Sequence, residues 1–180
     1  GGSIDPVYIV WNKRDWCPMA CKVFSSSVRA KREADVLSSL SHPNIVRLLD
    51  LEAPVHLLMP FLEGPTLANM IRNAPRKRLG IDDALRIAIH IGAALIHIHD
   101  RGYLHMDVKP SNVIIARGGT PILFDFGTAR GRSAARPDEI IGTDAYLAPE
   151  EALLETAGTP ADVFSFGVTL FDMLSGHLPF

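Results

Sequence analysis

The hydrophobic pattern of the chain changes at a connector over residues 60–66, which holds two prolines and a glycine. Before the connector, short β-branched and apolar runs predict strands at residues 7–11, 19–24, 45–51 and 55–59. One amphipathic helix over residues 28–40 interrupts these strands. After the connector, apolar residues recur at steps of three and four over residues 81–100, which is the period of a helix. The pattern predicts an α+β chain, with a small β-rich lobe followed by a larger, mainly helical lobe.

Composition and charge narrow the possible functions. The chain has 180 residues and a net charge of −2, so no basic surface for nucleic acid is indicated. The most apolar helical run, residues 87–98, is shorter than a bilayer requires and contains two histidines, so we expect no membrane segment. The two cysteines, Cys17 and Cys21, are interpreted as reduced, buried thiols of a cytoplasmic protein.

One group of polar residues is not explained by packing. Asp107, Lys109 and Asn112 put a carboxylate, an amine and an amide in one irregular stretch between a long helix and a short strand. Asp125 follows after another short strand, in the sequence Asp125-Phe126-Gly127. The oxygen atoms of Asn112 and Asp125, at adjacent strand ends, can share a hard divalent cation. Asp107 is then free to accept a proton.

Taken together, these motifs resemble those of the eukaryotic-like serine/threonine protein kinases. They occur in the order of that family: Ala20-Cys21-Lys22 on a strand, Glu33 on the next helix, the loop of residues 105–112, Asp125-Phe126-Gly127, Ala148-Pro149-Glu150 and the apolar helix that begins near Asp162. The resemblance implies a bilobal protein-kinase-like fold. Its N-terminal ATP-binding lobe would cover residues 1–59, its hinge residues 60–66 and its C-terminal catalytic lobe residues 67–180.

The family domain is larger than this chain. The resemblance therefore predicts that the first strand and the last helices of the domain lie outside these 180 residues. We expect activity to require the longer protein.

The resemblance also assigns catalytic roles. Lys22, oriented by an ion pair with Glu33, would hold the α- and β-phosphates of ATP. Asp107 would orient the hydroxyl of a Ser or Thr acceptor in a protein substrate and accept its proton. Lys109 would lie near the γ-phosphate.

The metal and nucleotide contacts follow in the same way. Asn112 and Asp125 would coordinate Mg²⁺. The other contacts to ATP would come from residues along the cleft: Gly2 in the phosphate-covering loop, Val7 and Ala20 above the adenine, Met59 as gatekeeper, Pro60 and Leu62 as the hinge C=O and N–H, and Ile114 below the adenine.

Two positions depart from the family pattern. Asp5 stands at the third glycine of the phosphate-covering loop, where a carboxylate would face the phosphates of ATP. Met106 stands where many members have an arginine that pairs with a phosphorylated activation loop. We therefore expect that phosphorylation at Thr128 or Ser133 is not the on-switch of this protein.

Two alternatives to an active kinase stay open. Asp5, Met106 and the abbreviated glycine loop favour a regulatory or scaffold protein with the kinase fold and weak catalysis. The intact residues Lys22, Asp107, Asn112 and Asp125 oppose it. A small-molecule phosphotransferase of the related fold would share the Asp…Asn loop. It would not be expected to carry Ala148-Pro149-Glu150.

Other residues are assigned secondary roles. Thr143 and Tyr146 are candidates for the edge that binds a peptide substrate, and Asp162 is expected to cap the backbone of the catalytic loop. His99 is expected to be an ordinary helix residue. The sequence leaves the oligomeric state open. The location is expected to be the cytoplasm, or the cytoplasmic face of a membrane if the longer protein carries an anchor.

Overall fold

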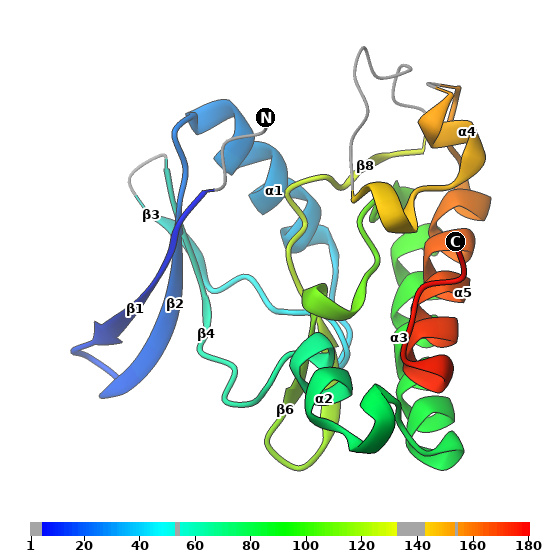
Figure 1. Ribbon diagram of the computed structural model, residues 1–180. Helices are drawn as coiled ribbons and strands as arrows, with labels where there is room; N and C mark the ends of the chain where they lie inside the picture. The colour runs from blue at the N-terminus through cyan, green and yellow to red at the C-terminus, as the bar shows by residue number, and fades with distance from the viewer. Residues whose placement is uncertain (1–4, 53–54, 133–142, 154) are drawn as a thin grey trace.

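The computed structural model describes residues 5–52, 55–132, 143–153 and 155–180. The first part of the chain forms a four-stranded antiparallel sheet of order β1-β2-β4-β3, with one helix beside it (Figure 1). Its elements are β1 (Val7–Asn12), β2 (Cys17–Val23), α1 (Ser27–Ser39), β3 (Asp50–Glu52) and β4 (His56–Pro60).

The rest of the chain is mainly helical, and its two long helices, α3 and α5, pack against each other (Figure 1). The short strands form two antiparallel pairs, β5 with β8 and β6 with β7. The elements are α2 (Leu67–Asn73), α3 (Ile81–Asp100), β5 (Tyr103–Leu104), β6 (Val113–Ala116), β7 (Thr120–Leu123), β8 (Arg130–Gly131), α4 (Pro149–Ala152) and α5 (Thr159–Ser175). The expected α+β architecture of a β-rich part followed by a helical part is confirmed.

One predicted strand is wrong for most of its length. Only Asp50 and Leu51 of the expected strand 45–51 lie in β3, and the Leu49 amide also donates to the Leu58 carbonyl of β4 at 2.8 Å. Instead, Ile45 forms an isolated parallel bridge with Leu123 of β7. The Val46 amide donates to the Leu123 carbonyl and the Leu123 amide donates to the Asn44 carbonyl, both at 2.9 Å. This segment therefore joins the sheet to the helical part, since tertiary pairing overrides the local strand preference.

The register of the sheet divides its side chains between two faces. Ala20 and Lys22 of β2 alternate with Cys21, because successive residues of a strand point to opposite faces. Lys22 pairs with Val7, and Ala20 pairs with Met59, so these residues share one face. They face the helical part, where the polar motif residues lie.

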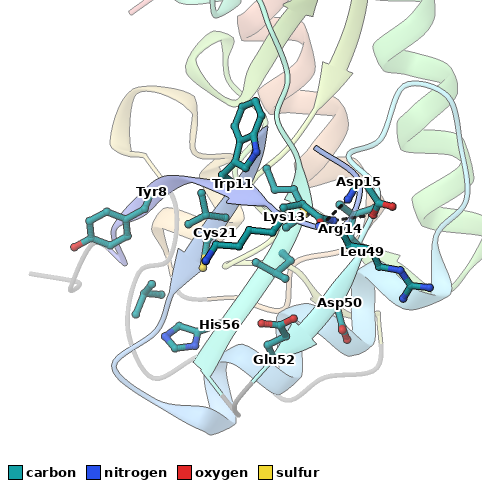
Figure 2. Close-up of a pocket in the computed structure, with 15 residues that line it drawn as sticks. Tyr8, Trp11, Lys13, Arg14, Asp15, Cys21, Leu49, Asp50, Glu52 and His56 are labelled. Atoms are coloured by element: carbon teal, nitrogen blue, oxygen red, sulfur yellow. Dashed lines mark hydrogen bonds between the residues drawn. The ribbon is translucent and has the colours of Figure 1, made fainter. Parts of the chain in front are cut away.

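The other face of the sheet lines a separate cavity. Figure 2 shows it, with Tyr8, Cys21 and His56 on the strands and Lys13 and Arg14 at the β1–β2 turn. Its volume is about 970 Å³. Neither Lys22 nor any other residue of the polar motifs lines it, so it does not belong to the site described below.

A continuous apolar core links the two parts. It includes Leu37 of α1, Leu57 of β4, Ile91 of α3 and Phe126, all of which are buried. The ring of Phe126 meets the buried ring of His105 edge to face, with centroids 4.8 Å apart. Burying each such apolar side chain stabilises the fold by about 1.5–3 kcal/mol. The sheet and the helical part are therefore held as one packed unit around the polar motifs.

None of the described helices is both long enough and apolar enough to cross a membrane. The cysteines are both free. Cys21 is buried, as expected, whereas Cys17 is exposed because it is the first residue of β2, beside the turn. The expectation of buried thiols is thus right for one residue and wrong for the other.

Candidate active site

Lys22 is the centre of a buried charge cluster. Its ammonium lies 2.8 Å from Glu33 Oε2 and 2.7 Å from Asp125 Oδ1. The pleat of β2 turns Lys22 toward the helical part, and α1 presents Glu33 from the middle of its buried face. The sequence prediction that Lys22 and Glu33 form an ion pair is therefore confirmed, and Asp125 joins it from a distant segment.

The cluster shifts the protonation equilibria of its members. Burial alone would lower the pKa of Lys22, but the Glu33 and Asp125 carboxylates outweigh burial and raise it. Burial opposes the charged form of Asp125, yet the Lys22 ammonium holds the pKa of this carboxyl below its usual range. Burial raises the pKa of Glu33, the most enclosed member. Lys22 therefore stays a cation at neutral pH.

A second cluster surrounds Asp107. Its Oδ2 atom accepts hydrogen bonds from the Lys109 ammonium at 2.6 Å and from the Asn112 amide at 2.9 Å. Its Oδ1 atom accepts from the hydroxyl of Thr143 at 2.9 Å. The same Thr143 hydroxyl accepts from Lys109. The carboxylate is thus fixed in direction by three side chains, one of which comes from a segment far along the chain.

Asp162 holds the backbone of the loop that carries Asp107. Its carboxylate accepts from the amides of His105 at 2.9 Å and Met106 at 2.8 Å, and it contacts His99 Nε2 at 2.8 Å. Burial opposes its charge, but the bonds from His99 and the loop amides lower the pKa of Asp162. The expected capping role is confirmed. His99, expected to be an ordinary helix residue, is instead a partner of this buried carboxylate.

Asn112 and Asp125 retain oxygen atoms suited to a cation. The amide nitrogen of Asn112 donates to the carbonyl and the carboxylate of Asp107, which directs Asn112 Oδ1 away from those bonds. Asp125 engages Lys22 and the Gly127 amide through Oδ1, which leaves Oδ2. Among the described residues no group of three His, Cys, Asp or Glu side chains forms a metal site. A cation at Asn112 and Asp125 would therefore need further oxygen ligands, such as phosphates.

A cleft of about 350 Å³ leads from Lys22 along the sheet. This volume is in the range of small-molecule sites. The expected nucleotide-binding residues that line it are Val7, Ala20, Lys22, Met59, Pro60, Leu62 and Ile114. Gly2, the remaining expected contact, lies outside the described residues. Phe61 of the expected hinge lines the cleft as well. Sequence reasoning missed Ile9, Val46 and Phe124, which also line it; the period of two along β1 gives Ile9 the same face as Val7.

Asp5 lines the same cleft, but its charge does not stand free. Arg29 Nη2 of α1 lies 2.7 Å from Asp5 Oδ2. The Asp5 carboxylate, which the sequence predicts to face the phosphates of ATP, is therefore paired with a cation of α1. The physical reason is that a buried carboxylate requires a paired donor, which α1 supplies.

Met106 has a packing role. Its side chain is buried in a small apolar cluster with Leu104, Ala148 and Ala161. Thr128 donates its hydroxyl hydrogen to the His105 carbonyl at 3.0 Å. Ser133 lies outside the described residues. The Met106 side chain therefore makes apolar contacts at the position where the family arginine would provide a positive charge.

The comparisons with known proteins agree with this geometry. The family described as Protein kinase domain matches residues 1–180. The probable serine/threonine-protein kinase PknB of Lactococcus lactis is 36% identical over 159 residues, which cover 84% of this chain and 25% of that protein. The serine/threonine-protein kinase pkn2 of Myxococcus xanthus is 39% identical over 164 residues, covering 84% of this chain and 19% of that protein.

A further relative matches almost the whole chain. The serine/threonine-protein kinase PknB of Mycolicibacterium smegmatis is 34% identical over 203 aligned positions, which cover 99% of this chain and 32% of that protein. The chain therefore spans about a third or less of the length of these relatives. Members of such a family use ATP, typically with Mg²⁺. The family match, the ordered motifs and the two charge clusters show that this chain belongs to the protein kinase domain family.

Proposed function

We propose that the protein of which this chain is part transfers the γ-phosphate of ATP to Ser or Thr hydroxyls of protein substrates. One observation carries the proposal: Lys22 lies between Glu33 and Asp125, at 2.8 and 2.7 Å, at one end of a cleft that has the size of a nucleotide site. The names of the similar proteins support serine/threonine specificity.

The proposed roles of the charged residues are those that the family resemblance implies, and their positions support them. Lys22 binds the α- and β-phosphates, and Glu33 orients it. Asp107 orients the acceptor hydroxyl and accepts its proton, while Lys109, 2.6 Å from Asp107, places positive charge beside the transferred phosphoryl group. The chemistry is mainly positioning and charge neutralisation, because little covalent work falls to the protein.

The divalent cation and the adenine take the remaining residues. Mg²⁺, held by Asn112 and Asp125, would neutralise phosphate charge. The apolar contacts to adenine would come from Val7, Ala20, Met59 and Ile114, and the hinge contacts from Pro60 and Leu62. Under this proposal residues 1–59 form the ATP-binding lobe, residues 60–66 the hinge and residues 67–180 the catalytic lobe.

The scaffold alternative loses one of its supports. Asp5 was a reason to expect weak phosphate binding, but its charge is balanced by Arg29.

The two free cysteines support a cytoplasmic location, where thiols stay reduced.

The test compares the full-length protein with its Asp107→Asn variant. Labelled ATP is supplied with Mg²⁺, and transfer is measured to the protein itself, to a generic basic protein, and to aminoglycosides or choline-like alcohols. We expect label on Ser and Thr of protein in the wild type and almost none in Asp107→Asn. Asp100→Asn, which changes an exposed carboxylate of α3 outside the site, serves as the matched control and should behave as wild type.

Each other outcome removes a distinct claim. Equal labelling by Asp107→Asn would remove Asp107 from the mechanism. Transfer to alcohols but not to protein would establish the small-molecule phosphotransferase. Binding of ATP with Mg²⁺ and no transfer by the wild type would establish the scaffold alternative.

A further inference from the structure

The segment that precedes β1 is tied to α1 by one ion pair. Arg29 Nη2 lies 2.7 Å from Asp5 Oδ2, and Arg29 Nη1 lies 3.4 Å from Asp5 Oδ1. Each carboxylate oxygen thus faces one terminal nitrogen of the guanidinium, and such two-point pairs fix orientation as well as distance. The Asp5 side chain is only 2% exposed, whereas that of Arg29 is 45% exposed.

Arg29 is placed to act on the catalytic ion pair. It lies four residues before Glu33 on α1, so the two side chains share one face of the helix. Glu33 is held at 2.8 Å by Lys22 of β2. The same face of α1 therefore forms ion pairs at two successive turns, with Asp5 at the first turn and with Lys22 at the second.

The backbone that follows Asp5 is fixed to the sheet as well. The carbonyl of Pro6 accepts a hydrogen bond from the Val23 amide at 2.9 Å, and β1 begins at Val7. Asp5 is thereby anchored beside the edge of the sheet. An outward movement of α1 would have to break the Asp5–Arg29 pair and the Lys22–Glu33 pair together.

We propose that Asp5 and Arg29 are positioning residues that hold α1 in the place where Glu33 meets Lys22. Glycine at position 5 would leave Arg29 without this partner. Asp5, which departs from the family pattern, therefore supplies an ion pair that holds α1, and we call the Asp5–Arg29 pair the latch. A third contact acts in the same direction: Arg32 Nη2 donates to the Gly127 carbonyl at 3.3 Å, next to Asp125. The latch is made of groups within the chain and requires no phosphate on another segment. The catalytic part of this proposal rests on the proposed function.

The test uses the full-length protein and four variants. Arg29→Met keeps the length of the side chain and removes its charge, Asp5→Asn removes the opposite charge, and Arg29→Lys restores a cation. Lys31→Met is the matched control, because within the described part of the chain Lys31 pairs with the exposed Asp35 on the same helix and with no other carboxylate. We expect Arg29→Met and Asp5→Asn each to lower kcat about tenfold, since paired charges of this kind couple by that order. Arg29→Lys should recover most of the loss, and Lys31→Met should match wild type.

Two further measurements separate positioning from simple stabilisation. In a Glu33→Gln background, Arg29→Met should cause no further loss of kcat, because the effect of Arg29 passes through Glu33. The double variant Asp5→Asn/Arg29→Met should be no worse than either single variant. If the losses multiply in either combination, or if Arg29→Met lowers only the melting temperature and leaves kcat unchanged, the proposal is overturned.

A measurement without catalysis keeps this proposal distinct from the proposed function. Amide hydrogen exchange over residues 30–37 reports the opening of α1 directly. If the wild type transfers no phosphate, the proposed function fails, and exchange then decides the role of the pair. Faster exchange in Arg29→Met than in wild type and in Lys31→Met supports the latch. Equal exchange in all three proteins overturns it.

Discussion

Replacing Thr143 by valine keeps the volume of the side chain but removes the hydroxyl that joins Asp107 to Lys109. The hydroxyl donates to Asp107 Oδ1 at 2.9 Å and accepts from Lys109. The acceptor is a carboxylate whose side chain is only 10% exposed. A hydrogen bond to such a charged group contributes about 1.5–3 kcal/mol. If Asp107 must keep one orientation to receive a proton, losing this hydrogen bond raises the activation free energy of phosphate transfer by the same amount.

The expected effect on rate follows from that figure. Since about 1.36 kcal/mol is a factor of ten, kcat for Thr143→Val should fall about 10- to 150-fold. Thr143→Ser retains the hydroxyl and should stay within a few-fold of wild type. The assay is steady-state phosphate transfer by the full-length protein at saturating ATP, with the melting temperature of each variant measured alongside.

Two results would refute the reasoning. If Thr143→Val keeps the wild-type kcat, the hydroxyl does not hold Asp107 in a way that matters for transfer. If Thr143→Ser is as slow as Thr143→Val, then the methyl group of Thr143 and not its hydroxyl is responsible. In either case Thr143 would return to the peptide-binding role considered from the sequence.

Three more predictions follow from other parts of the molecule. Gly176 ends α5 at φ +80°, and a Cβ there would lie 2.5 Å from the Lys77 carbonyl oxygen, so Gly176→Ala should lower the free energy of unfolding by about 2 kcal/mol or more; Gly167→Ala, in open space on the same helix, should not destabilise in the same denaturant titration. Complete burial lowers the pKa of His105 below its ordinary value of about 6.5, so the unfolded chain binds a proton that the folded chain does not, and stability should decline as the pH falls below about 6.5; His105→Phe should flatten that decline in thermal melts at graded pH. Because Met106 is apolar and buried, phosphatase treatment of the full-length protein should leave the transfer rate unchanged, and a large fall in rate would contradict this.

The local hydrophobic pattern of the sequence was sufficient to predict most of the helices and strands. The helix expected over residues 28–40 is α1, and the one expected over residues 81–100 is α3. Their apolar periods are long and regular, which is where sequence reasoning is strongest. The run 45–51 failed because its hydrophobic residues are equally suited to a strand and to the extended link that bonds with Leu123.

The candidate site shows the same division. The resemblance picked out Lys22, Glu33, Asp107 and Asp125 by residue type and order. It did not find that Arg29 neutralises Asp5, because nothing in the spacing of these two residues distinguishes this pair from other charged residues of the chain. His99 was also missed, since its partner Asp162 lies on a different helix.

The sequence by itself determined which residues are available for phosphate chemistry and on which kind of element each one lies. Only the tertiary structure decided their distances. Lys22 and Asp125 are 103 positions apart, yet their charged atoms lie 2.7 Å from each other. The physical reason is that periodicity and capping act over a few residues, whereas such a contact requires the whole apolar core between α1, β7 and α3 to be packed first.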